Sequence, residues 1–224
     1  MAQRLRTIVQ RLFHALPVLF GVIVITFLLT RALPGDPAVY FAGPAATPES
    51  IAEIRRSLGL DRSLPEQFLF YLGDLSRGDL GQSLATGQPV TSDLLSRLPA
   101  SLELTLAALL LSTLIAIPIG ILAALNPGTI VDHLCRLLVT MGVSLPTFFT
   151  GLALIFAFYY LLGWAPSPIG RLDFAYLPPD HVTGFFTLDA LLAGDAETAL
   201  AAASQLALPA ITLALFTLAP IARM

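Results

Sequence analysis

The sequence has little charge and a single cysteine. Charged residues make up 12 % of its 224 residues, whereas a typical soluble domain carries about 25 %. Because Cys135 is the only cysteine, the chain cannot form an intramolecular disulfide. The net charge of −3 is small, so the composition gives no reason to expect a nucleic-acid partner. These shortages argue against a disulfide-stabilised or nucleic-acid-binding protein, and against an ordinary soluble domain.

The sequence also lacks the residue patterns of common catalytic sites. It contains no P-loop, no G-x-S-x-G and no H-E-x-x-H. His14, His133 and His181 are widely separated along the chain, and we do not expect them to form a metal cluster. The sequence therefore predicts no catalytic, cofactor-binding or metal-binding residues, and a protein that is not an enzyme.

Long apolar segments are what the sequence has in abundance. Hydrophobic residues make up 56 % of the chain, and the mean hydropathy is +0.80. In the segment Leu102–Leu125 the only ionisable residue is Glu103. At about 1.5 Å per residue this segment reaches about 36 Å, enough to cross a hydrocarbon core of about 30 Å. It therefore predicts a membrane-spanning helix, and we expect Glu103, near its outer end, to have a solvated, structural role rather than to relay protons.

Three further apolar segments have the length expected of membrane spans. The first could instead be a signal peptide, but it is longer than the apolar region of such a peptide, and no A-x-A cleavage site follows it. Pro146 lies inside the third segment and is expected to kink it. The sequence thus predicts an all-α integral membrane protein, a polytopic helix bundle with four transmembrane helices and two long extracytoplasmic loops. The predicted spans are approximately residues 12–32, 102–125, 136–164 and 206–222, and the predicted loops are residues 34–99 and 165–205.

The arginines predict which side of the membrane each connection faces. Five of them share one side if all four segments cross: Arg4, Arg6, Arg11, Arg136 and Arg223. Because positive residues are enriched in cytoplasmic connections, we expect this side, with the N-terminus, to be cytoplasmic. The two long loops, both net negative, then face outward.

Two helices are expected within the first long loop. Pro48–Leu58 follows Thr47, whose hydroxyl suits a helix N-cap, and places proline at the first helical position. Pro65–Ser76 carries apolar residues at helical spacing, so one of its faces is apolar. We expect that face to lie on the rest of the loop or on the membrane surface.

Small residues recur at every fourth position of the second predicted span. They are Ala108, Ser112, Ala116, Gly120 and Ala124. Small residues at this spacing let a second transmembrane helix approach closely. The other interpretation is chance, since the segment is rich in alanine and leucine. We predict a helix-packing stripe.

Six short motifs follow one another along the chain: LPGDP (Leu33–Pro37), LGLD (Leu58–Asp61), GDLGQS (Gly78–Ser83), LPASLELTLAAL (Leu98–Leu109), SLPTFF (Ser144–Phe149) and LPAITLAL (Leu208–Leu215). With these six motifs in this order, the chain resembles the B-type inner-membrane permease subunit of ATP-binding-cassette importers of the dipeptide/oligopeptide/nickel family. Members of that family have six spans and, after the position equivalent to Arg223, a cytoplasmic coupling loop that docks on the ATPase. The resemblance therefore implies that the chain is truncated before this loop.

The resemblance also implies a mechanism and a set of partners. A solute-binding protein outside the membrane delivers peptides, two permease subunits form a heterodimeric path through the bilayer, and two cytoplasmic ATPase subunits power transport. The membrane would be the inner membrane of a bacterium or archaeon. In this interpretation Ser144, Pro146 and Thr147 line the path, because hydroxyls beside a proline break offer hydrogen bonds to a solute. The competing interpretation is that these hydroxyls bond to the preceding helical turn.

Two other classes of function remain open at this stage. An ion-coupled secondary carrier would be expected to bury ionisable residues or to show inverted repeats. A membrane assembly protein without transport activity would need neither. The transported solute also remains open among dipeptides, longer peptides, glutathione and nickel.

Overall fold

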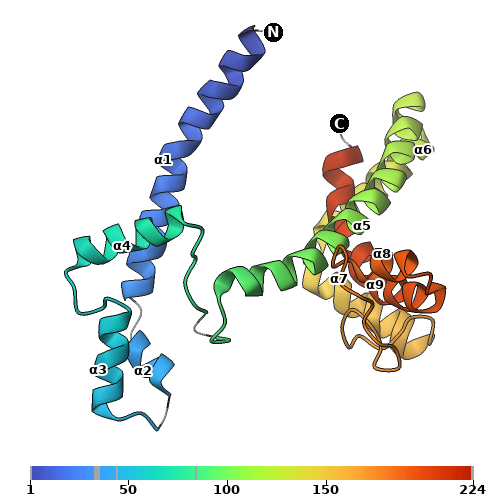
Figure 1. Ribbon diagram of the computed structural model, residues 1–224. Coiled ribbons are helices and arrows are strands. Elements are labelled where there is room, and N and C mark those ends of the chain that lie inside the picture. The colour runs from blue at the N-terminus through green and yellow to red at the C-terminus, as the bar shows by residue number, and fades with distance from the viewer. Residues whose placement is uncertain (1, 33–35, 44, 84, 223–224) are drawn as a thin grey trace. The chain divides into compact units, whose positions relative to one another are not determined.

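The computed structural model describes residues 2–32, 36–43, 45–83 and 85–222 (Figure 1). Within these ranges the regular structure is helical, apart from one isolated bridge between Gln82 and Pro89, which confirms the all-α class. The chain divides into two compact units, Met1–Asp93 and Leu94–Met224. Two sets of residues used in the sequence analysis lie outside the described residues: Leu33–Gly35, from the motif LPGDP, and Arg223–Met224.

The first unit contains a long apolar helix followed by three short ones. The two helices predicted in its loop are confirmed, with Thr47 accepting a hydrogen bond of 3.3 Å from the backbone N–H of Ser50. Asp36 caps the helix before them in the same way, through the backbone N–H of Ala38 at 3.0 Å. The helices are α1 (Ala2–Ala32), α2 (Pro37–Ala42), α3 (Pro48–Ser57) and α4 (Leu64–Ser76).

Helix α4 packs against the C-terminal part of α1 through aromatic side chains. Phe27 of α1 is 5 % exposed. Its ring centroid lies 5.1 Å from that of Phe68 and 5.7 Å from that of Tyr71. Beside them, Arg31 Nε donates a hydrogen bond of 2.7 Å to Gln67 Oε1. The apolar face expected on α4 is thus partly covered within the first unit.

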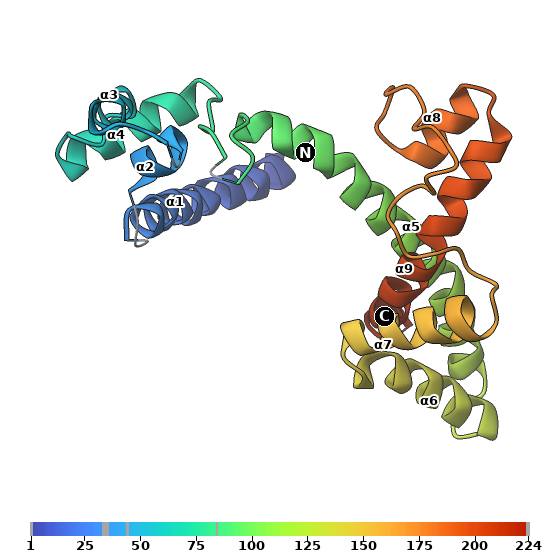
Figure 2. The same ribbon diagram turned by 90° about the horizontal axis from the view of Figure 1, so that it is seen from below.

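The second unit is a helical bundle built around the end of the chain. Figure 2 shows α8 beside the start of α9, and α6 and α7 beside its C-terminal half. One seven-residue segment, η1, is a π-helix. The elements are α5 (Val90–Leu125), α6 (Ile130–Ser144), α7 (Thr147–Leu154), η1 (Ile155–Leu161), α8 (Phe186–Leu192) and α9 (Ala196–Ala222).

The third predicted span is not one continuous helix. Helix α6 ends at Ser144, and α7 begins at Thr147. Leu145 is extended, with φ −104° and ψ 142°, because the ring of Pro146 disfavours a helical conformation in the residue before it. The predicted kink is therefore a complete break, and the predicted number of four spanning helices is not exact. Among the described residues, 3 helices are long and apolar enough to cross a membrane, namely α1, α5 and α9.

Helices α5 and α9 run in the same direction. Ala116 of α5 shares a buried cluster with Leu218 and Ala219 of α9. One turn further along, Gly120 lies against the backbone of Ala222. Two helices that run parallel cross a membrane in the same sense, and this agrees with the predicted order of spans. The membrane boundaries themselves stay predictions.

Candidate functional site

A cavity near the break between α6 and α7 has a volume of about 550 Å³. Its walls come from α7 and η1, from α9, from Leu104 of α5 and from the loop segment 166–170. Most of the lining side chains are apolar. Thr147, Ser204, Gln205 and Thr212 are the polar ones. A hydroxyl and an amide in an apolar wall are typical of a site that orients a small ligand.

A second cavity of about 240 Å³ adjoins the first one. The two share Leu104, Gly170, Gln205 and Pro209 in their linings. The second cavity has charged groups in its lining, because Glu103 and Arg171 both line it. Gln205 therefore stands between a cavity without charged lining residues and one lined by an ion pair.

Glu103 is not solvated, and this part of our sequence-based expectation is wrong. It is 8 % exposed. Arg171, from the loop after η1, donates a hydrogen bond of 2.8 Å to Glu103 Oε2, and the backbone N–H of Thr187 donates one of 2.9 Å to Oε1. The same guanidinium donates to the carbonyl oxygen of Gly184 at 2.7 Å and lies 3.7 Å from the ring centroid of Phe186. Glu103 thus ties the loop after η1 to α5.

Asp189 organises the same loop from within. Its side chain is 2 % exposed and accepts hydrogen bonds from the backbone N–H groups of Thr183 and Gly184, both at 2.8 Å. The hydroxyl of Thr183 donates another at 2.7 Å. Burial raises the pKa of the Asp189 carboxyl, but these hydrogen bonds outweigh burial and bring the pKa below its usual value. These hydrogen bonds hold the loop segment that contains Thr183 and Gly184 against α8.

Gln205 is the unusual residue of the site. Its side chain is 7 % exposed, and its amide nitrogen Nε2 has no hydrogen-bond partner among the described residues. Buried amide groups in proteins are nearly always hydrogen-bonded. The sequence analysis missed this residue, although a glutamine at the start of the apolar run Leu206–Ala222 was a signal. It also missed Arg171, the one basic residue of its loop.

The three predicted path residues are not equivalent. The hydroxyl of Ser144 donates a hydrogen bond of 2.7 Å to the carbonyl oxygen of Thr140, one turn earlier, as the competing interpretation expected. Pro146 ends the helix, as described above. Thr147 lines the larger cavity. A role of any of them in a transport path stays a prediction.

The residues of the small-residue stripe also differ from one another in burial. Ala108, Ser112 and Ala116 are buried, and Gly120 packs against α9. Ala124 is exposed. Contact with α9 is seen at Ala116 and at Gly120, and a packing role for the rest of the stripe stays a prediction.

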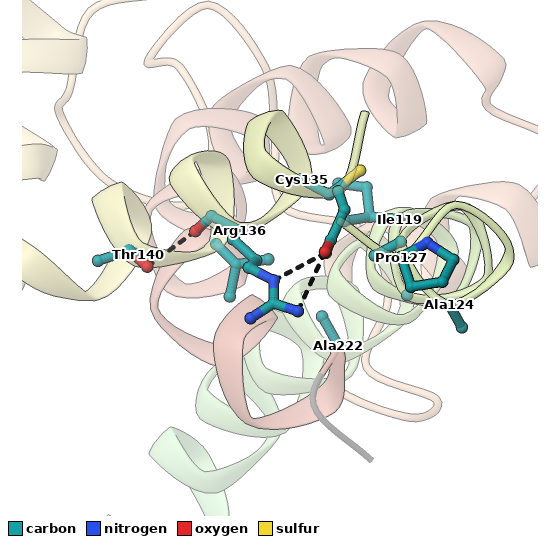
Figure 3. A pocket seen from close by; sticks show the side chains of 11 residues that line it. Ile119, Ala124, Pro127, Cys135, Arg136, Thr140 and Ala222 are labelled. Atoms are coloured by element: carbon teal, nitrogen blue, oxygen red, sulfur yellow. Dashed lines mark hydrogen bonds and ion pairs between the residues drawn. The ribbon is translucent and has the colours of Figure 1, made fainter. Parts of the chain in front are cut away.

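A third cavity, of about 580 Å³, lies at the other end of the bundle, where α5 ends, α6 begins and α9 ends (Figure 3). Arg136 donates two hydrogen bonds, of 2.7 and 3.1 Å, to the carboxylate of Asp132. The guanidinium holds the pKa of the Asp132 carboxyl below its usual value. Since the charges of this pair neutralise each other, the described residues that line the third cavity offer no unpaired charge to a ligand.

Comparison with known proteins identifies the family. The model of the N-terminal part of binding-protein-dependent transport system membrane components matches residues 4–105. The model of the binding-protein-dependent transport system inner membrane component matches residues 116–224. Between them the two models leave little of the chain unmatched.

Individual relatives agree with the family models. The "Probable D,D-dipeptide transport system permease protein" of Escherichia coli K12 is 47 % identical over 214 residues, which are 96 % of this chain and 63 % of the relative. The "Di/tripeptide transport system permease protein" of Pseudomonas aeruginosa UCBPP-PA14 is 42 % identical over 97 % of this chain and 64 % of the relative. A glutathione transport system permease protein of Escherichia coli O6:H1 is 37 % identical over 73 % of this chain and 53 % of the relative.

The chain spans just under two thirds of the length of the first two of these relatives. The relatives are transport permeases rather than enzymes. Their match, together with the apolar helices, makes this a multi-pass membrane protein. The chain belongs to the family of inner-membrane permease components of binding-protein-dependent transport systems.

Proposed function

We propose that the chain is a permease subunit of an ATP-binding-cassette importer and forms part of the path for di- or oligopeptides. The observation that carries this proposal is the 47 % identity to a dipeptide permease over 96 % of the chain. A permease named for di- and tripeptides is similar over a comparable range. Cavities of several hundred cubic ångströms beside a broken helix suit a solute of that size.

In this proposal the chain works with several partners. A solute-binding protein delivers the peptide outside, a sister permease completes the path as a heterodimer, and two ATPase subunits supply the energy inside. The many exposed apolar side chains of α1 and α5 support the bilayer and a second permease as neighbours, since such side chains are unfavourable in water. Examples are Phe13, Phe20, Leu110 and Leu114.

The proposed orientation has the N-terminus in the cytoplasm of a bacterial or archaeal cell. Its support is the gathering of the end of α5, the start of α6 and the end of α9 around one cavity, opposite the loop that holds Glu103. In a Cys135→Ala background, cysteines replacing Gly73 and Leu177 should react with a membrane-impermeant maleimide added to intact cells. A cysteine replacing Ile130 should react only after the cells are opened. The reverse pattern would refute the orientation.

The transport proposal is tested by reconstitution. The chain is placed in proteoliposomes with its sister permease, both ATPases and the binding protein, and uptake of a radiolabelled dipeptide is measured. We expect uptake that requires ATP and that disappears when the binding protein is omitted. Uptake driven by an ion gradient without ATP would refute the proposal in favour of a secondary carrier. Absence of uptake under both conditions, with the complex intact, would favour an assembly protein.

A further inference from the structure

The side-chain amide nitrogen of Gln205 is buried without a hydrogen-bond partner among the described residues, although buried amide groups are normally hydrogen-bonded. Its side chain lines both adjoining cavities, and Nε2 has no hydrogen-bond acceptor among the described residues. Two other polar groups nearby are occupied. Ser204 donates to the carbonyl oxygen of Ala201 at 2.7 Å, and Thr212 donates to that of Leu208 at 2.8 Å. Of the buried side-chain polar atoms that line the two cavities, Nε2 of Gln205 is the one without a partner among the described residues, and it lies between the cavities.

The chemistry of this donor limits what can bind it. A primary amide N–H₂ donates hydrogen bonds, so its partner must be an acceptor such as a carbonyl or carboxylate oxygen. A bare anion is disfavoured here, because the carboxylate of Glu103 lines the smaller cavity and its charge is already matched by Arg171. An uncharged carbonyl oxygen fits best.

The walls around the donor specify the rest of the ligand. The larger cavity presents apolar side chains, including Leu104, Ile155 and Leu213, within about 550 Å³. That volume accommodates an apolar amino-acid side chain, and pockets of about 300–1,000 Å³ are the usual size for small ligands. The smaller cavity has the hydroxyl of Ser101 and the ion pair of Glu103 and Arg171 in its lining. A carbonyl flanked by an apolar group and a polar group is the pattern of a peptide unit.

We propose that Gln205 and its two cavities form a subsite within the permease that binds one peptide unit of the solute. Nε2 of Gln205 donates a hydrogen bond to a backbone carbonyl oxygen, and the side chain next to that carbonyl occupies the larger cavity. This proposal rests on the function proposed above, since it names the group of the peptide that the chain recognises. It assigns the specificity to a main-chain group and to the apolar character of one side chain.

The test uses protection of a single cysteine in the assembled transporter. Thr212→Cys, in a Cys135→Ala background, places a thiol in the wall of the larger cavity, and a small water-soluble maleimide reports its accessibility. L-alanyl-L-phenylalanine should slow labelling. Its thioamide analogue, in which the weakly accepting sulfur atom replaces the carbonyl oxygen, should slow labelling about two- to tenfold less, the ratio expected for one hydrogen bond. Leu177→Cys, on the exposed loop after η1, is the control whose labelling neither compound changes.

Two variants separate the amide from the rest of the wall. Adding Gln205→Leu should remove the difference between the dipeptide and its thioamide analogue. Adding Ser204→Ala should preserve the difference, because that hydroxyl already bonds to its own helix. If Gln205→Leu fails to assemble, the comparison of the two compounds with Gln205 intact decides the question by itself.

Three results would overturn the proposal. Equal protection by both compounds would show that the carbonyl is not recognised. Protection by dihexanoyl phosphatidylcholine but not by the dipeptide would assign the cavity to lipid. No protection by any compound would leave only water as the partner of Gln205. If ATP-dependent dipeptide uptake persists alongside any of these results, the subsite is refuted while the importer function stands.

Discussion

Replacing Gly120 by leucine should separate α5 from α9 at their closest approach. A Cβ atom added at Gly120 would lie 3.1 Å from the carbonyl oxygen of Ala222 and 3.8 Å from its Cα. This neighbour is backbone, so it cannot rotate away as a side chain would. The two helices must therefore move apart, or α9 must shift along its axis.

The magnitude follows from two opposing effects. Overpacking in a well-packed region costs about 1–3 kcal/mol. Replacing a helical glycine by a residue with a side chain returns up to about 1 kcal/mol through helix propensity. For Gly120→Ala the two effects nearly cancel, whereas leucine adds three further carbon atoms against the same backbone, and its net cost is about 1–2 kcal/mol. At about 2–4 °C per kcal/mol, the melting temperature should fall by about 2–8 °C.

The assay is thermal unfolding of the purified protein in detergent, followed by tryptophan fluorescence. The matched control is Gly21→Leu in α1, where an added Cβ has no neighbour within 4 Å among the described residues. The control should unfold at the same temperature as the parent or higher. If Gly120→Leu and Gly21→Leu shift the melting temperature equally, the close approach of α5 and α9 is refuted.

Three further predictions concern α4 and the loop after η1. Arg171→Met leaves Glu103 buried without its partner and should destabilise the second unit by about 3 kcal/mol, whereas the double variant with Glu103→Leu should recover most of this loss in thermal unfolding. The pKa of Asp189 is lowered by folding, so its stabilising contribution is complete above the usual pKa of about 3.9 and is lost as the pH falls through the lower folded value. For the parent protein, proteolysis of the loop should therefore accelerate in strong acid. For Asp189→Asn, the loop should be susceptible to proteolysis already at neutral pH, and acid should cause no further acceleration. Phe27→Leu removes two aromatic contacts worth about 1–3 kcal/mol together, so amide hydrogen exchange in α4 should accelerate about five- to hundredfold.

Local sequence signals predicted the helices and their ends well where a helix end depends on contacts between residues that are close in the sequence. The hydroxyl of Thr47 caps α3 through an N–H group three residues away, so no distant contact is needed to predict it. The length and apolar character of α5 follow from composition alone. Pro146 acts locally too, but whether proline kinks or ends a helix depends on the contacts that stabilise each half. Here α7 packs on α9, and the two halves separate.

Burial and partners of the polar residues could not be predicted in the same way. Glu103 looked solvated because it lies near the end of an apolar run, but its ion-pair partner is Arg171, far along the chain. Gln205 looked like the last residue of a loop, but it lies inside α9 against two cavities. In both cases the outcome depends on how a loop folds back over the helices.

The sequence by itself determined that the chain is helical, membrane-spanning and built on the pattern of a permease, because length, hydropathy and local motifs are properties of contiguous residues. Only the tertiary structure decided which small residues of α5 are buried, since Ala108 and Ala124 have the same periodicity but only Ala108 is covered. The same holds for the free amide of Gln205. Which neighbour covers a residue is set by helices packing across long sequence separations, and helical periodicity carries no information on that packing.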